Sequence, residues 1–279
     1  MRSSAPATSA PPITVATYNI HGCVGTDRRF DLPRVAEAIR ALDADVIALQ
    51  EVGDVRGRGP AGDYAAELAH RTGLAVIYQP TMLRGERAYG NAILTRFPVV
   101  GSRSYDLSYG RREPRGCIRA DLVVDGRRFH VFDVHLGLSR REQRAQAGRL
   151  LGADIVRGAA IAWPIVVMGD FNFWFPGPIA RMVRRELTDV AAVLSAAQPS
   201  YPSRRPFLRL DRIYVDDAWI PLDCRVVRTP LTERASDHLP LVARLRLRPG
   251  APPPPGAEEG EVRPAERPVR GLVERDPPA

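Results

Sequence analysis

One short apolar stretch constrains the fold of this chain more than any other. Residues 165–168 (IVVM) are uniformly apolar and are followed by Gly169, Asp170, Phe171 and Asn172. A run of this kind predicts a strand that is buried on both faces. Asp170 and Asn172 are two positions apart, so in an extended chain their side chains point to the same side. Two polar side chains delivered together at a strand end can serve a functional site, or they can form an Asx turn that ends the strand. The residues at the other strand ends distinguish these two interpretations.

Further strands and helices are predicted along the chain from apolar periodicity. The expected strands are residues 13–20, 45–49, 74–78, 89–95, 117–124, 128–136, 165–169, 210–215, 224–228 and 239–247. The expected helices are residues 31–42, 64–71, 139–160 and 178–186, the third beginning with a capping box of Ser139 and Glu142. Asp125-Gly126 predicts a tight hairpin turn, and residues 104–116 predict a polar loop. This mixture predicts an α/β protein with mixed sheets flanked by helices.

The length of 279 residues allows one large domain or two small ones. Residues 1–12 are small and proline-rich, and residues 249–279 are proline-rich without apolar periodicity, so both ends are predicted to be disordered. The folded domain is therefore expected to span residues 13–248. No apolar stretch reaches the ~18 residues that a membrane span needs, and the N-terminus has no apolar core typical of a signal peptide. Three cysteines at unrelated spacings, Cys23, Cys117 and Cys224, indicate no disulfide framework, so we expect a cytoplasmic protein.

The net charge is +8, and every basic residue is arginine. Arginine binds phosphate groups in a bidentate manner, so this surface suits phosphate-bearing partners. Codon bias is an equally good explanation for the absence of lysine. No run of five basic residues occurs, so the charge gives only weak support to nucleic-acid binding.

Polar residues end most of the predicted strands. These residues are Asn19, Glu51, Asn91, His135, Asp170 with Asn172, and Asp237 with His238, while Asp211 begins a further strand. A set of carboxylate and amide oxygens is the ligand set that Mg²⁺ or Mn²⁺ prefers, whereas zinc favours nitrogen and sulfur. Two histidines and an additional aspartate remain for proton transfer and for stabilising the negative charge of a phosphate group. Together these residues predict an enzyme that hydrolyses phosphoesters.

The ordered motifs resemble the endonuclease/exonuclease/phosphatase family. TYNIHG, LQE, YGNAIL, DVHL, GDFN, LDRIYV and SDH follow one another in this order, and the resemblance covers residues 13–248. It implies a deoxyribonuclease I-like, four-layer α/β/β/α sandwich, in which two central mixed sheets pack face to face with helices outside. It also implies an active site at one edge of the sandwich.

The resemblance further implies a role for each matching residue. Glu51, Asn19 and Asp237 match the metal-binding positions, with Mg²⁺ as the expected ion and Mn²⁺ as an alternative. His238 matches the catalytic histidine, which Asp211 would orient. Asp170 would activate the attacking water, Asn172 would hold phosphate or water, and His135 resembles a second histidine found in some branches. His21 stands where the repair-enzyme branch has an aspartate, so the number of metal ions, one or two, is left open. His21 and Asn91 are expected to contact substrate.

The substrate is left open among three hypotheses. The first is a nuclease, whose loop 104–116 would bind polymer phosphates through Arg112 and Arg115, assisted by Arg204 and Arg205. The second is a phospholipid or inositol-phosphate phosphoesterase. Aromatic residues beside Asp170 could contact lipid, stack on bases or form a plug under the site; these are Phe171, Phe173, Trp174 and Phe175. The third is an inactive binding module, although every matched catalytic position is occupied. We expect a monomer in each case.

Overall fold

The computed structural model describes residues 11–158, 161, 164–175 and 177–249. Most of the predicted disordered N-terminus (residues 1–12) and of the proline-rich tail (residues 249–279) lies outside these residues. Within the described part of the chain, no helix is both long and apolar enough to cross a membrane.

The first sheet contains six strands in the order β11-β12-β1-β2-β4-β3. β1 and β2 are parallel, and the other neighbours are antiparallel. The strands are β1 (Ile13–Asn19), β2 (Val46–Gly53), β3 (Ala75–Arg84), β4 (Arg87–Thr95), β11 (Trp219–Val226) and β12 (Leu241–Leu247). Strands from both ends of the domain therefore share one sheet.

The second sheet also contains six strands, in the order β5-β6-β7-β8-β10-β9. β7 and β8 are parallel and the remaining pairs are antiparallel. The strands are β5 (Val99–Asp106), β6 (Gly116–Val124), β7 (Arg127–His135), β8 (Ile165–Asp170), β9 (Thr188–Asp189) and β10 (Asp211–Val215). The apolar run that ends in Gly-Asp-Phe-Asn forms β8, which is fully buried as predicted.

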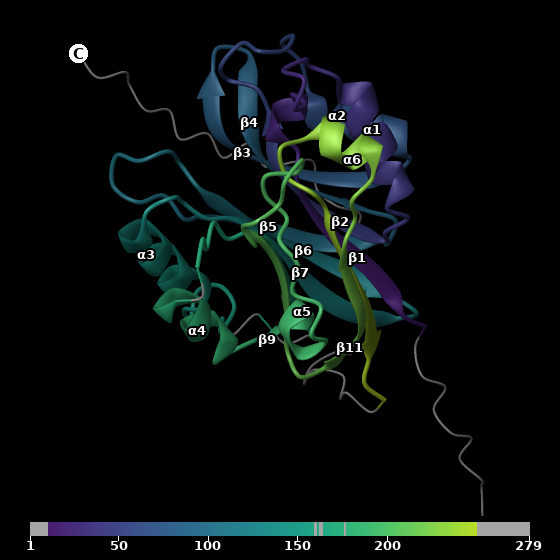
Figure 1. The fold of residues 1–279 in the computed structure, drawn as a ribbon. Helices are drawn as coiled ribbons and strands as arrows, with labels where there is room; N and C mark the ends of the chain where they lie inside the picture. The colour runs from purple at the N-terminus through teal and green to yellow at the C-terminus, as the bar shows by residue number, and fades with distance from the viewer. Residues whose placement is uncertain (1–10, 159–160, 162–163, 176, 250–279) are drawn as a thin grey trace, which may run out of the picture.

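The two sheets pack face to face around one apolar core, and helices cover their outer faces (Figure 1). α1 (Leu32–Ala41), α2 (Tyr64–Thr72) and α6 (Pro230–Ala235) pack on the first sheet through a second apolar cluster. α3 (Arg140–Leu150) and α4 (Pro178–Arg184) cover the second sheet through a third. Two short helices, η1 (His21–Cys23) and α5 (Val190–Val193), lie in connections. The predicted four-layer α/β/β/α sandwich is confirmed.

Strand direction explains why the polar strand ends meet. β1 and β2 run in parallel, so both deliver their carboxyl ends to one edge, and antiparallel β12 begins beside the end of β1. In the second sheet, β7 and β8 end together and antiparallel β10 begins opposite β8, with Asp211 paired to Asp170. The two edges face each other, since Asn19 Nδ2 of β1 donates to Oδ2 of Asp170 at 3.1 Å.

Some predicted elements differ from those observed. The helix expected over residues 139–160 begins with the predicted capping box but ends at Leu150, because Gly152 is a poor helix former. β5 (Val99–Asp106) was not predicted, since it is an edge strand whose exposed polar residues hide the apolar alternation. The short elements α5, α6 and β9 were missed for lack of periodicity. The Asp125-Gly126 turn is confirmed, with both residues at positive φ.

Candidate active site

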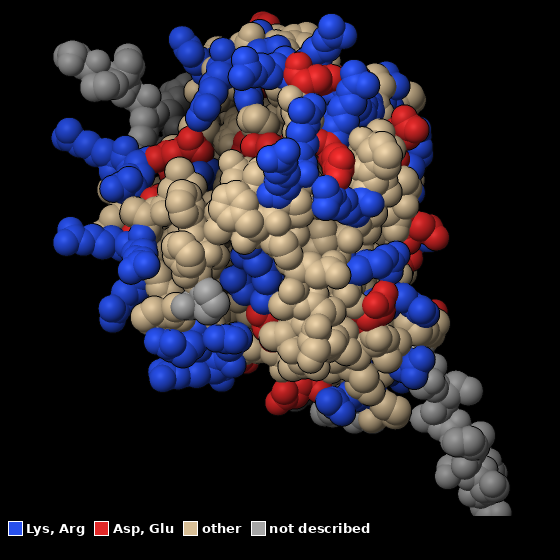
Figure 2. Space-filling model, viewed as in Figure 1, with Lys and Arg blue, Asp and Glu red and all other residues tan. Residues whose placement is uncertain are grey.

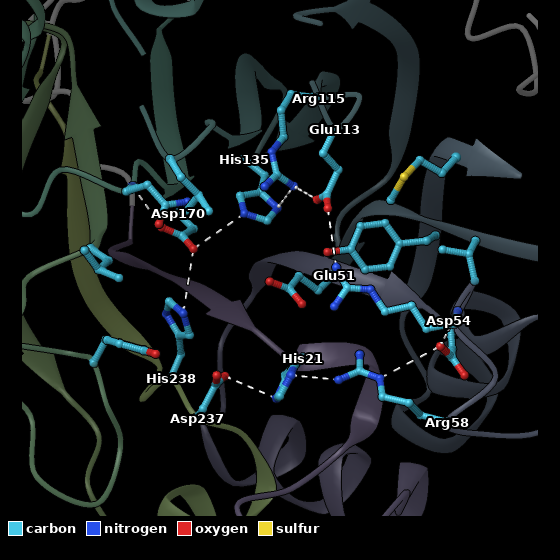
Figure 3. Close-up of a pocket in the computed structure, with 18 of the residues that line it drawn as sticks. His21, Glu51, Asp54, Arg58, Glu113, Arg115, His135, Asp170, Asp237 and His238 are labelled. Atoms are coloured by element: carbon cyan, nitrogen blue, oxygen red, sulfur yellow. Dashed lines mark hydrogen bonds and ion pairs between the residues drawn. The ribbon is translucent and has the colours of Figure 1, made fainter. Parts of the chain in front are cut away.

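A cavity of about 330 Å³ opens at the edge where the two sheets meet. Figure 3 shows side chains from both sheets converging on it. Eight of the residues predicted from the sequence line the cavity: His21, Glu51, Arg115, His135, Asp170, Asn172, Asp237 and His238. Asn19 and Asp211 lie directly behind this layer, where they contact Asp170 and His238.

Glu51 reaches the cavity because β2 contains a bulge. β2 has one more residue than β4 between the pairs Leu49–Ala92 and Val52–Gly90. Within the bulge, Glu51 adopts a φ of 59°, which is left-handed and costs a non-glycine residue about 1–3 kcal/mol. A bulge re-aims side chains that regular alternation would send to opposite faces. The carboxylate of Glu51 points into the cavity (Figure 3).

The turn after β8 fixes Asp170 and Asn172 by backbone geometry. Gly169 has a φ of 151°, and a Cβ atom there would lie 1.9 Å from the carbonyl oxygen of Val134. Asn172 adopts a φ of 53°, and its backbone N–H donates to Oδ1 of Asp170 at 2.9 Å. Its side-chain Nδ2 donates to the carbonyl of Leu136, which leaves Oδ1 of Asn172 for a ligand in the cavity. Asp170 and Asn172 therefore form an Asx turn and also line the cavity.

Asp170 lies between two imidazole rings. Its Oδ2 is 3.6 Å from Nε2 of His135 and 3.7 Å from Nε2 of His238. Burial raises the pKa of Asp170 to about 6; His238 opposes this rise, the negative charge of Asp211 adds to it, and the Asn19 hydrogen bond again opposes it. The buried carboxylate is thus flanked on both sides by groups that can donate hydrogen bonds to a substrate (Figure 3).

A hydrogen-bonded chain holds His238. Oδ2 of Asp211 is 2.9 Å from Nδ1 of His238, and Ser200 Oγ donates to the same oxygen at 2.5 Å. Burial lowers the pKa of His238, but the charges of Asp211 and Asp170 outweigh it and raise this pKa to about 10. His238 is therefore an imidazolium at neutral pH, with its Nε2–H directed toward Asp170. The ring of Tyr201 packs against it at a centroid distance of 4.8 Å.

His135 is held in the opposite charge state. Burial, together with the positive charges of Arg115 and His238, keeps the pKa of His135 well below its usual range. Arg115 Nη1 lies 3.3 Å from Nδ1 of His135 and 2.6 Å from Oε1 of Glu113. A guanidinium can only donate, so Nδ1 must accept and the ring proton is on Nε2, facing Asp170. Arg115 thus fixes the tautomer of His135.

This contact predicts that Arg115→Met will lower kcat. The variant keeps the buried aliphatic stem but removes the donor that holds His135, and mispositioning a catalytic group typically costs roughly 10- to 100-fold. Arg112→Ala is the matched control, because Arg112 is exposed and outside the cavity. Steady-state kinetics on a soluble phosphodiester would measure both variants. Equal losses in the two would show that neither arginine acts through His135.

The carboxylates of Glu51 and Asp237 fit a hard divalent cation. Within the described residues, Oε2 of Glu51 and Oδ2 of Asp237 have no hydrogen-bond donor, and both residues line the cavity. Asn19 presents Nδ2 to Glu51 at 3.0 Å and accepts from the His21 N–H through Oδ1 at 3.0 Å. In this arrangement Asn19 orients the carboxylates of Glu51 and Asp170 and directs no oxygen at the cavity. All-oxygen donors are the preference of Mg²⁺.

Asp170, Asp211 and His238 form a second group whose ligand atoms lie within 4.8 Å of one another. Metal binding there is disfavoured by the state of His238. Its Nδ1 already contacts Asp211, and the raised pKa keeps Nε2 protonated. A protonated imidazole has no lone pair for a metal.

Two residues predicted to bind substrate lie away from the cavity. Asn91 is buried in β4 opposite the β2 bulge and is absent from the cavity wall. Arg112 is exposed on the loop before β6, 3.9 Å from Glu142. The sequence motif could identify these residues but not the direction of their side chains. Arg115 lines the cavity but is buried, with its guanidinium in contact with His135 and Glu113, whereas the prediction placed it on an open polymer-binding loop.

The sequence did not reveal the part of the cavity wall that Arg58 and Asp54 form. Arg58 Nη1 lies 2.8 Å from Nε2 of His21, whose Nδ1 faces Oδ1 of Asp237 at 3.5 Å. Arg58 is also 3.9 Å from Asp54. This chain of polar contacts runs along the side of the cavity opposite His135 (Figure 3). In the sequence, this part of the cavity wall appears only as a segment rich in glycine and arginine after β2.

Comparison with known proteins identifies the family of this chain. A sequence model of the Endonuclease/Exonuclease/phosphatase family matches residues 16–238, which include the cavity residues from His21 to His238. The chain belongs to this family, and the resemblance inferred from the motifs is confirmed.

Individual relatives agree in both sequence and fold. The chain is 32% identical to the Escherichia coli (strain K12) protein YbhP over 246 residues, covering 84% of this chain and 96% of YbhP. The crystal structure of an endonuclease/exonuclease/phosphatase from Beutenbergia cavernae superposes with a TM-score of 0.69 at 24% identity, covering 85% and 72% of the two chains. The human Nocturnin catalytic domain, which carries a bound sulfate, gives a TM-score of 0.66 at 23% identity and coverages of 85% and 94%.

Proposed function

We propose that this protein is a divalent-metal-dependent hydrolase that cleaves phosphodiester bonds by in-line attack of water. The observation that carries the proposal is the buried carboxylate of Asp170 between His135 and His238 in an open cavity. Family membership supports a phosphoester hydrolase as the reaction class. No residue needs to form a covalent intermediate.

Each side chain has a role that follows from its charge state. Asp170 would accept a proton from the attacking water, since it is a buried base with a pKa near neutrality. The His238 imidazolium and the neutral His135 would both donate from Nε2 to the phosphoryl oxygens as negative charge develops. Oδ1 of Asn172 would orient the water. Asp211 and Arg115 hold the two rings in place.

Glu51 and Asp237 would hold the metal ion, with Mg²⁺ preferred and Mn²⁺ accepted, and Asn19 would position Glu51. When bound, such an ion supplies positive charge that neutralises phosphate oxygens. The remaining contributions come from the groups described above.

The charge of the cavity favours a diester over a monoester. Five carboxylates line it, and its three arginines are all paired with carboxylates: Arg56 with Glu113, Arg58 with Asp54, and Arg115 with Glu113. A diester carries one negative charge at phosphorus and a monoester carries up to two. With no unpaired arginine in the described wall, the singly charged group is easier to accommodate. Nucleic acids and phospholipids both contain such diesters.

Removal of metal is expected to abolish hydrolysis, and Mg²⁺ or Mn²⁺ should restore it. The reason is that Glu51, Asp237 and Asp170 leave the cavity too negative to hold an anionic phosphate unaided. The measurement is turnover of a nitrophenyl phosphodiester in excess EDTA and after addition of each ion. The same assay would then be applied to plasmid DNA, RNA, sphingomyelin and phosphoinositides. Full turnover in EDTA would contradict the metal assignment.

A further inference from the structure

Most of the large exposed apolar side chains lie on segments that line the cavity. Seven such side chains occur in the described part of the chain, and six lie on segments that also line the cavity. We call these six the apolar rim: Leu83, Tyr109, Leu138, Trp174, Phe175 and Phe207. The seventh, Val193, lies in α5, which contributes no residue to the cavity. Exposing large apolar groups selectively around one opening indicates a binding surface.

The apolar rim comes from five separate segments of the chain. Leu83 follows the cavity residue Met82 at the end of β3, and Tyr109 precedes Glu113 and Arg115 in the β5–β6 connection. Leu138 and the Trp174–Phe175 pair follow β7 and β8. Phe207 lies in the loop that contains Tyr201, to whose carbonyl its N–H donates at 2.9 Å. Five separate segments that line the cavity thus expose large apolar side chains.

The apolar surface continues into the cavity itself. Leu138 is 64% exposed and Trp174 is 54% exposed, yet both line the cavity that contains Asp170. A ligand whose phosphate reached Asp170 would therefore meet apolar side chains immediately outside. This arrangement suits an amphiphile with a phosphoester head and an apolar body.

Arginines on the same segments supply complementary charge. Arg84, Arg111 and Arg205 are exposed, and none of them forms an ion pair within the described residues. Figure 2 shows arginines surrounding the hollow in which carboxylates are visible. A basic surface with aromatic and aliphatic side chains is typical of proteins that lie in the interface of an anionic membrane.

We propose that the apolar rim docks on an anionic lipid bilayer and that the phosphoester reaching the cavity is a lipid headgroup. This inference rests on the proposed phosphodiesterase function and names its substrate class. The rim side chains would enter the interface, the unpaired arginines would contact lipid phosphates, and one headgroup would enter the cavity.

A single-stranded nucleic acid fits the same surface less well. Leu83 and Leu138 offer no ring on which a base can stack, and stacking supplies much of the binding energy for single strands. A strand would also need unpaired cations beside the reacting phosphate, whereas all three arginines of the cavity wall are paired with carboxylates. A bilayer places only one phosphate in the cavity and leaves the others at the rim.

Vesicle binding of the full chain in EDTA tests the proposal without any turnover. Sedimentation with vesicles of phosphatidylcholine alone, and of phosphatidylcholine with phosphatidylglycerol, should show binding to the anionic vesicles. Phe175→Ala with Phe207→Ala should weaken the partition coefficient roughly 10- to 100-fold, because two large apolar side chains no longer leave water. Arg111→Ala with Arg205→Ala should weaken it by roughly tenfold or more. Val193→Ser is the matched control, since it removes an exposed apolar side chain away from the cavity and should bind as the wild type does.

The net charge of +8 makes the matched control essential, because any basic protein adsorbs to anionic vesicles. The proposal is overturned if no vesicle is bound, or if the rim variant binds as tightly as Val193→Ser. Tighter binding to an oligothymidine strand than to vesicles, lost in the rim variant, would also overturn it and assign the surface to nucleic acid. Hydrolysis of the soluble nitrophenyl diester, assayed separately with Mg²⁺, reports on the phosphodiesterase proposal alone. Circular dichroism melts would show that the variants are folded.

Discussion

Replacing His238 by alanine is expected to lower kcat by roughly 10²–10⁴, the usual contribution of a positioned acid–base group. The structure places the ring within 3.7 Å of Asp170 and holds it in one orientation through Asp211. In the proposed mechanism, His238 and His135 are the two donors that stabilise the phosphoryl oxygens. The measurement is kcat on a soluble phosphodiester under saturating Mg²⁺.

Asp211→Asn should cost a comparable factor, because the amide no longer stabilises the imidazolium and can favour the wrong ring orientation. The double variant should be little worse than either single one, since residues that act as a unit are non-additive. Ser200→Ala should lower kcat by a smaller factor, because it removes a donor to Asp211 but leaves the Asp211–His238 contact. Fully additive losses would separate the two residues and assign Asp211 to the stability of β10 instead.

Asp170→Asn is expected to cause a loss of roughly 10²–10⁴ in kcat, with a smaller change in KM. The amide keeps the size and the hydrogen bond from the Asn172 N–H, but it cannot take a proton from water. The substitution also removes the negative charge that lies between His135 and His238. Steady-state kinetics and a thermal melt would be measured on the same preparation.

Asp133→Asn is a matched control for this experiment. Asp133 is also a fully buried aspartate, in neighbouring β7, and burial raises its pKa well above the usual range, which favours the uncharged form. Its partner Gln50, which donates at 2.7 Å, can donate equally well to an asparagine oxygen. Asp133→Asn should keep kcat within a few-fold of wild type. A comparable loss in both variants would mean that activity responds to buried aspartates in general rather than to Asp170.

The sequence predicted those parts of the fold in which the apolar composition of a segment and the direction of its strand allow few alternatives. β8 reads as a buried strand because every residue from Ile165 to Met168 is apolar, and the family motifs then fixed the topology. Asp170 and His135 end such strands and His238 precedes one, so strand ends drew attention to them, and the family resemblance then implied their roles. In a regular strand, the spacing of residues shows directly which side chains point to the same face.

The remaining features depend on contacts that no local pattern encodes. The bulge that turns Glu51 inward is set by pairing with β4, and the ion pair of Arg115 with Glu113 depends on how the β5–β6 loop folds back. For the same reason Arg112 and Arg115, three residues apart, lie in different environments. The charge states of His135 and His238 differ because their neighbours differ, and those neighbours come from distant parts of the chain.

Neither sheet carries a complete site. Glu51 and Asp237 come from the first sheet and its connections, while His135, Asp170 and Asp211 come from the second. Their alignment is therefore set by the interdigitated side chains of the central core, among them Val15, Val131 and Met168. A displacement of one sheet against the other by a fraction of a side chain would separate Asp170 from Glu51 and Asp237 while every strand stayed intact. The proposed activity therefore depends on the register of the two sheets, and it should be lost before the secondary structure melts.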